Sequence, residues 1–124
     1  MEINSLGTLV AIRTLDLLAE DGTIVGTVSV KLGKPKKIAQ SEDYYCPFQI
    51  LGIGSEKIRY GIGVDAMQAL ILALTKIGSH LYTSSESKSR RLRWMGDQSG
   101  NLGVLLFTES ALELVLEPTH KLLL

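Results

Sequence analysis

Alternating apolar and polar positions near the start of the chain predict a β-hairpin. Residues 8–20 and 23–32 flank Asp21-Gly22, a dipeptide favoured in type I′ turns because both central residues take positive φ. With Glu20 opposite Thr23, both segments turn their apolar residues to one face, and such agreement across a turn supports the register. This face comprises Ala11, Leu15, Leu17, Ala19, Ile24, Gly26, Val28, Val30 and Leu32. Arg13 is the exception on it, and we expect Arg13 near a margin of the sheet.

Two further segments alternate with the same period of two residues. In residues 43–53, Pro47 cannot donate a ladder hydrogen bond, which predicts an edge strand or a bulge. The face opposite Pro47 carries Tyr44, Cys46, Phe48 and Ile50. Residues 57–64 place one apolar set opposite Lys57, Arg59, Gly61 and Gly63; that set is Ile58, Tyr60, Ile62 and Val64.

The period changes to that of a helix after Asp65. Asp65 and Gln68 match a capping box, in which each side chain satisfies a backbone N–H at the helix start. We therefore predict a helix over about Ala66–Tyr82, with an apolar stripe at helical spacing. The stripe comprises Met67, Leu70, Ile71, Leu74, Gly78 and Leu81. Ala69, Leu72 and Ala73 extend the apolar surface beyond it, and we predict that they form a self-association face, so a homodimer is an open alternative.

The rest of the chain is read as connections and short elements. Residues 33–43 are predicted to be a loop, 83–91 a solvated linker, 92–95 and 102–107 short strands. In the tail at 108–124, helical spacing of glutamates favours a short helix before Pro118, although residues 112–117 also alternate like a strand. The fold class expected is α+β, an antiparallel sheet of about four to six strands with one main helix on one face.

Composition narrows the class of protein. Hydrophobic residues make up 45% and charged residues 21% of the 124 residues, which is typical of one globular domain spanning 1–124. Lys+Arg and Asp+Glu each number 13, so zero net charge provides no general attraction to nucleic acid or membranes. No stretch reaches about 18 apolar residues, and the first residues lack the basic region of a signal peptide. We expect a cytoplasmic protein.

Residues 61–66 spell G-x-G-x-x-A, which resembles a dinucleotide-binding turn. That turn requires a parallel β-α-β unit, whereas tight turns make the strands expected here antiparallel. The Asp65 carboxylate would also occupy the N–H groups that a phosphate needs. We therefore predict no nucleotide or other cofactor, and interpret Gly61 and Gly63 as positions of close packing.

The candidate catalytic residues are few. Cys46 would be a nucleophile if His80 or His120 served as its base, but its alternation places it with core residues, where free cysteine is common. His80 is expected near a helix C-terminus, which favours an imidazolium without a catalytic role. Two distant histidines and one cysteine form no metal-binding pattern. We predict no catalytic residues and no metal site, and lean against an enzyme.

The strongest candidate surface is the basic and aromatic run at Arg90, Arg91, Arg93 and Trp94. Such a run can anchor an acidic protein partner or grip phosphates while the indole stacks on a base. The plainer alternative is an ordinary strand, with Leu92 and Trp94 turned inward and Arg91 and Arg93 turned to water.

The segments "YYCPFQI", "RYGIGVDAMQALILAL" and "LYTS" within residues 44–84, followed by residues 91–103, resemble a family of short bacterial hypothetical proteins of unknown function. The layout also resembles small antitoxin- and immunity-type inhibitors at the level of fold. We therefore expect a small binding module that acts through a protein partner, in its most concrete form an inhibitor. The alternative is a nucleic-acid-associated accessory domain that uses the run from Arg90 to Trp94.

Overall fold

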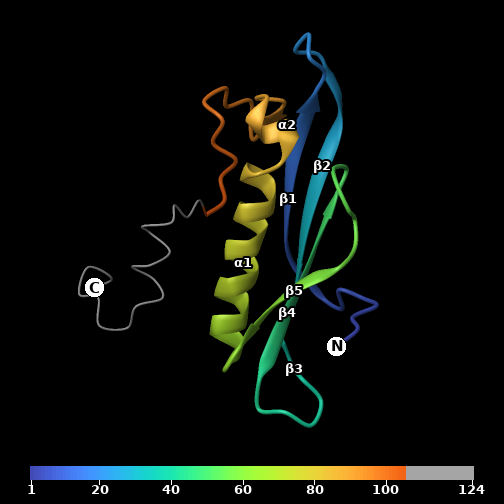
Figure 1. Ribbon diagram of the computed structural model, residues 1–124, viewed down its shortest axis with the longest axis vertical. Coiled ribbons are helices and arrows are strands. Elements are labelled where there is room, and N and C mark those ends of the chain that lie inside the picture. Colours follow the sequence, from blue (N-terminus) through green and yellow to red (C-terminus); the bar gives the residue numbers. More distant parts are fainter. Residues whose placement is uncertain (106–124) are drawn as a thin grey trace, which may run out of the picture.

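The fold is described over residues 1–105 by a computed structural model of the chain. The elements are β1 (Leu9–Leu18), β2 (Ile24–Gly33), β3 (Lys36–Lys37), β4 (Tyr44–Leu51), β5 (Arg59–Gly63), α1 (Ala66–Tyr82), α2 (Ser85–Lys88) and β6 (Leu92–Arg93). All strand pairs are antiparallel, in the order β3-β4-β2-β1-β6, and β5 pairs with β4. Helix α1 lies along one face of this sheet, which confirms the α+β prediction (Figure 1).

The first hairpin has the predicted register but a different turn. Leu15 pairs with Val28 and Leu17 with Gly26, as expected. The type I′ prediction is wrong, because Gly22 has φ 89° while Asp21 does not have a positive φ. Instead the loop closes through bonds from Ala19 N to Thr23 O (2.8 Å) and from Gly22 N to Ala19 O (3.0 Å). Such a loop takes a single residue in the left-handed region, and glycine fills that position.

Irregular pairing near this turn moves one more residue into the core. The register shifts between Leu17 and Leu18, and Leu18 is buried although simple alternation places it on the polar face. A bulge inserts one extra residue into a strand and so turns the following side chains over. The alternation holds in the middle of the hairpin, where Leu15, Val28, Val30 and Leu32 are buried, but Ala11 and Ile24 of the predicted apolar face are exposed.

Strand β4 is an interior strand, so the prediction of an edge strand from Pro47 is wrong. One side of β4 pairs with β5 over Tyr44–Phe48, and the other pairs with β3 at Tyr44 and Tyr45 and with β2 from Phe48 onward. Within the described residues, Pro47 lies in the gap between the β3 and β2 pairings, so its missing N–H breaks no bond on that side. The side chain packs against Gly33 instead.

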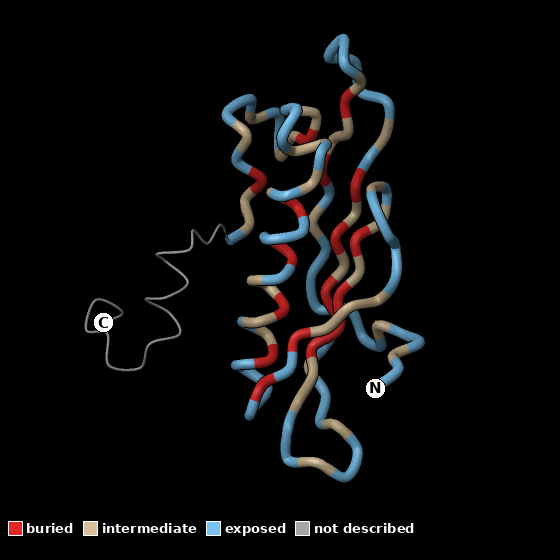
Figure 2. The backbone as a smooth tube through the Cα atoms, in the orientation of Figure 1, coloured by how far each residue is buried: buried red, intermediate tan, exposed pale blue. Residues whose placement is uncertain are grey.

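The helix has the predicted limits, but its buried face coincides only in part with the predicted stripe. The Asp65 carboxylate accepts a bond from Gln68 N at 2.8 Å, which confirms the cap. The buried residues of α1 are Ala69, Ala73, Ile77, Gly78 and Leu81. Gly78 and Leu81 of the predicted stripe are therefore buried as expected, whereas Met67 and Ile71 are exposed. Figure 2 shows that the buried positions of α1 recur along its side toward the sheet. Of the predicted self-association face, Ala69 and Ala73 are 0% exposed and Leu72 is half-buried, so its two alanines are not on the surface of the described chain.

Small residues on both elements explain this choice of face. A Cβ added to Gly61 would lie 2.5 Å from Ala73 N and 2.8 Å from Ala69 O, and Gly63 contacts the helix backbone around Ala69 equally closely. The backbones of β5 and α1 can therefore approach only because glycines face alanines. This close approach confirms the packing role expected for the two glycines.

The segment after α1 is more ordered than the sequence suggests. The predicted linker contains α2, whose first turn is capped by a bond from Ser87 N to Ser84 Oγ at 3.1 Å. Strand β6 extends the sheet beside β1, as the predicted strand at 92–95 implies. Of the strand predicted at 102–107, residues 102–105 are not in a strand. Residues 106 and 107, and the helix or strand predicted for the tail, lie outside the described residues.

Over residues 1–105, no helix is both long and apolar enough to cross a membrane.

Candidate functional site

The arginines of the predicted surface have separate local partners. Arg90 has φ 60° and its Nη1 donates to Ser99 O, while Arg91 Nε donates to Ser89 Oγ at 2.9 Å. Arg93 belongs to β6 and is paired with Asp16 of β1. The run that looks uniform in sequence is thus divided between a helix end, a loop contact and a strand.

Trp94 is held from within the protein. The guanidinium carbon of Arg13 lies 4.3 Å from the centre of the indole, and Arg13 Nη1 donates to Leu102 O at 2.8 Å. This cation–π contact explains how Arg13 occupies the apolar face of β1, because the indole and a carbonyl together replace its water. One face of the indole is therefore taken, which argues against stacking of a base there.

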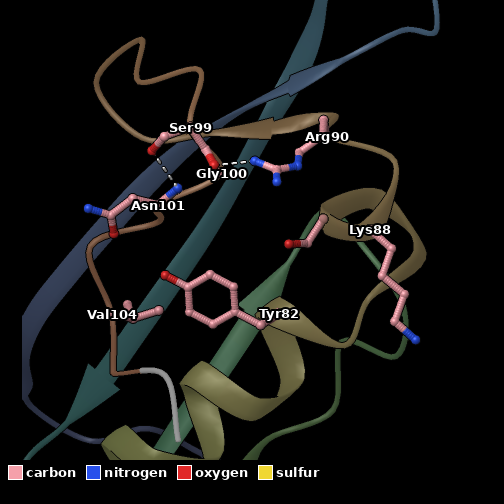
Figure 3. A pocket seen from close by; sticks show the side chains of 8 residues that line it. Tyr82, Lys88, Arg90, Ser99, Gly100, Asn101 and Val104 are labelled. Carbon is pink, nitrogen blue, oxygen red and sulfur yellow. Dashed lines mark hydrogen bonds between the residues drawn. The ribbon is translucent and has the colours of Figure 1, made fainter. Parts of the chain in front are cut away.

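A hollow of about 580 Å³ lies beside Arg90 (Figure 3). Its lining includes Tyr82, Ser87, Lys88, Arg90, Ser99 and Asn101. The Tyr82 hydroxyl accepts a bond from Leu102 N at 3.0 Å, and Figure 3 shows the Lys88 side chain directed away from the tyrosine. The described lining has no carboxylate, histidine or cysteine, so it offers no pair for acid–base or nucleophilic chemistry.

The G-x-G-x-x-A residues do not form a phosphate site. The β4–β5 pair before the helix is antiparallel, Asp65 occupies Gln68 N, and Gln68 Oε1 accepts from Val64 N at 2.7 Å. The N–H groups of Val64 and Gln68 are therefore already bonded within the chain, and the Asp65 carboxylate would repel a pyrophosphate at this helix start.

Cys46 lies in the core, as its alternation predicts. The side chain is 0% exposed, and its Sγ donates a weak bond to Gly33 O at 3.3 Å. Burial raises the pKa of the thiol to about 11. Within residues 1–105 no hydrogen bond joins Cys46 to a histidine, and no group of three His, Cys, Asp or Glu side chains is arranged for a metal. These surroundings suit a packing residue rather than a nucleophile.

His80 lies near the C-terminus of α1 and close to Phe48, with 6.2 Å between ring centroids. The pKa of His80 is lowered from its usual 6.5 by desolvation, and further by the positive charges of Arg59, Lys76 and Lys57. The prediction that the helix dipole favours an imidazolium is thus outweighed by its other surroundings.

Stability should therefore depend on pH through His80. Since the pKa is lower in the folded state, the unfolded state binds more protons as pH falls through 6.5. The free energy of unfolding should decrease from about pH 7.5 to about pH 5.5, and His80→Gln should reduce this decrease. Urea unfolding at both pH values checks this. The pKa values of Asp21 and Asp97 are lowered from 3.8, so these two groups affect the free energy of unfolding only at lower pH. An unchanged pH dependence in His80→Gln would contradict the interpretation.

Three exposed apolar residues, together called the apolar corner, follow one another closely in the chain where β5 leads into α1: Ile62, Val64 and Met67. These side chains are 42%, 71% and 70% exposed. They are exposed because glycine and alanine occupy the buried faces of β5 and α1, which leaves the larger apolar residues outside. The sequence analysis did not identify this surface. Its signal was the alternation of glycines with large apolar residues in β5, because close packing on the glycine side leaves the large residues on the other side.

The open edge of β5 beside this corner is partly covered. Because Pro47 has no N–H, its pairing with Tyr60 turns the N–H and C=O of Tyr60 away from β4. There Lys76 Nζ donates to Tyr60 O at 2.9 Å, and the Gln68 side chain takes Val64 N. A lysine placed on an edge in this way discourages the addition of another strand.

Comparison with known proteins gives a family without an assigned activity. Residues 11–106 match the family described as "Domain of unknown function (DUF6968)". This match confirms the expectation of a family of unknown function. Neither a curated protein nor a solved structure was found to match the chain.

Proposed function

The chain belongs to DUF6968, a family of domains of unknown function, and from this premise we propose that it is a non-enzymatic binding module acting through a protein partner. The observation that carries the proposal is the apolar corner. Ile62, Val64 and Met67 are large apolar side chains left exposed at one junction of the fold, and exposed apolar surface commonly marks an interaction site.

The corner has features of a side-chain docking surface. Val64 and Met67 flank the cap of α1, whose backbone groups are held by the paired bonds of Asp65 and Gln68. Their backbone is therefore fixed before binding, which lowers the entropy that association costs. Met67 adds a flexible thioether that adapts to an apolar partner surface. Since Lys76 and Gln68 cover the β5 edge, the partner would contact side chains rather than extend the sheet.

An inhibitor resembling immunity proteins or antitoxins is the most concrete form of this role. Such a protein needs a firm scaffold and a contact surface but no reactive group. A cytoplasmic location belongs to the same proposal and is consistent with the single cysteine being buried and free. The nucleic-acid alternative through Arg90, Arg91, Arg93 and Trp94 is less favoured, because Trp94 is engaged by Arg13.

The test is capture of partners from the native host with Val64→Glu/Met67→Glu compared with wild type. We expect wild type to retain one dominant protein at about 50 and about 200 mM salt, and the variant to lose it, because apolar contacts are insensitive to salt. The control, Ala39→Glu/Gln98→Glu, adds the same charge at exposed positions elsewhere and should retain the protein.

Each other outcome is informative. A partner kept by the corner variant would contradict docking at the corner. Nucleic acid retained only at the lower salt would support the alternative through the basic run. Sedimentation of both variants distinguishes a second copy of this chain from a different protein. Equal melting temperatures of the two variants establish that neither is unfolded.

A further inference from the structure

A second hollow lies between the start of β5 and the C-terminal half of α1, at the opposite end of these elements from the apolar corner. Its volume is about 380 Å³, and its polar lining comprises Lys57, Arg59, Tyr60, Lys76, Ser79 and His80. Arg59 opens β5 and Lys57 precedes it by two residues, while the spacing of four residues places Lys76 and His80 on one helix face. The topology thus gathers cations that lie apart in the sequence.

The positive charge of this hollow is not neutralised within the described chain. Between residues 1 and 105, the only ion pair joins Lys37 to Glu42, far from the hollow in sequence. The neighbouring Glu56 is directed elsewhere, since its Oε2 accepts from Gly52 N at 2.7 Å. No carboxylate contributes to the described lining. An excess of three cations is notable in a protein whose net charge is zero.

The groups are also partly positioned. Lys76 Nζ is held by Tyr60 O at 2.9 Å and lies 5.8 Å from the centre of the Tyr60 ring. Arg59 is half-buried, which restricts its guanidinium. The pKa of His80 is lowered first by desolvation and then by the charges of Arg59, Lys76 and Lys57, which are all close enough to act on its ring. Like charges brought together without a counter-ion repel each other, and an anion between them would relieve this.

We propose that this hollow binds the phosphate group of a small phosphorylated molecule. Arg59 presents the planar fork that binds phosphate oxygens in pairs, and the lysines supply point charges. Tyr60 and Ser79 offer hydroxyls, and His80 a ring N–H. A hollow of this size exceeds what phosphate alone requires and falls in the range of small-molecule sites. The proposal does not depend on a partner at the apolar corner.

Bound phosphate should in turn act on His80. The groups that face its imidazole are the cations of β5 and α1, the Phe48 ring of β4, and Ser55 and Ser84 at the neighbouring rim. An anion between them offsets the repulsion that disfavours the imidazolium. Occupancy is therefore expected to raise the pKa of His80.

The experiment is an NMR titration of the full chain with inorganic phosphate and with phenyl phosphate, following backbone amides and the His80 ring. We expect saturable shifts confined to β5 and the end of α1, with tighter binding of phenyl phosphate and an upward shift of the His80 pKa. Lys57→Gln/Lys76→Gln should weaken binding by about 10-fold or more. The matched control Lys36→Gln/Lys37→Gln removes the same charge from β3 and should change binding less than about 2-fold.

Three results would overturn the proposal. The first is a response to phosphate that does not saturate. The second is equal weakening in both double variants, which would reduce the effect to net charge. The third is an equal response to phenyl sulfate and chloride, which would mean an adventitious ion only. Arg59→Lys gives a further check, because it keeps the charge but removes the fork and should still weaken binding.

Discussion

Gly61→Ala is expected to lower the free energy of unfolding by about 3 kcal/mol, and Gly63→Ala by a similar amount. The added methyl at Gly61 would meet Ala73 N at 2.5 Å and Ala69 O at 2.8 Å. Both atoms belong to the backbone of α1, so no side chain can rotate away to make room. The helix must move off β5 and lose contact along its buried face, which includes Ala69 and Ala73 at 0% exposure.

Gly26→Ala is the matched control, because Gly26 also lies in a strand but has no heavy atom within 4 Å of the added Cβ. Its φ is not positive, so alanine fits without strain and restricts only the unfolded chain. We expect a change between zero and a gain of about 1 kcal/mol. Urea unfolding of the three variants measures the difference. Equal losses in all three would show that strand glycines, rather than the helix contact, determine the effect.

The Cys46 thiol is expected to react with a disulfide reagent at least 100-fold more slowly in the folded protein than in the unfolded chain. Its pKa of about 11 against the usual 9.0 reduces the thiolate, the reactive form, by about 100-fold near pH 8. Burial at 0% exposure slows the reagent further. The reaction should therefore follow the opening of the core around β4.

Thr23→Cys supplies the control, since it places a second thiol at an exposed position in the first hairpin. That thiol should react in the folded protein at a rate close to that in urea, while Cys46 remains protected. A folded Cys46 that reacts within about 10-fold of the unfolded rate would contradict the packing role. It would also revive an enzyme hypothesis, which full biological activity of Cys46→Ala would then exclude.

The sequence shows where the charged residues of the candidate surfaces stand along the chain, but it does not show which of them come together in the fold. The run from Arg90 to Trp94 is continuous in sequence, yet Arg13 from β1 engages its indole and Ser99 engages Arg90. Conversely, Lys57 and Lys76 are distant in sequence and line one hollow. Side chains from distant segments come together through strand pairing and helix packing, so no local sequence pattern reveals which of them share a site.

Local chemistry determined the elements themselves. The start of α1 follows from Asp65 and Gln68, because a capping box is satisfied entirely within one turn. The register of the first hairpin follows from matching apolar faces on each side of Asp21-Gly22, which nearby residues decide. The core face of β4, with Cys46, Phe48 and Ile50, likewise follows from simple alternation.

Only the tertiary structure decided which apolar face of α1 is buried and where Pro47 is tolerated. The stripe with Met67 and Ile71 is the more hydrophobic choice, yet Ala69 and Ala73 are buried because Gly61 and Gly63 permit close approach there. The hydrophobicity of a helix face can be compared from the sequence of that helix alone. Which face is buried also depends on how well its shape fits the partner strand. That selection leaves large apolar side chains at the corner of β5 and α1, where the sequence predicted a core.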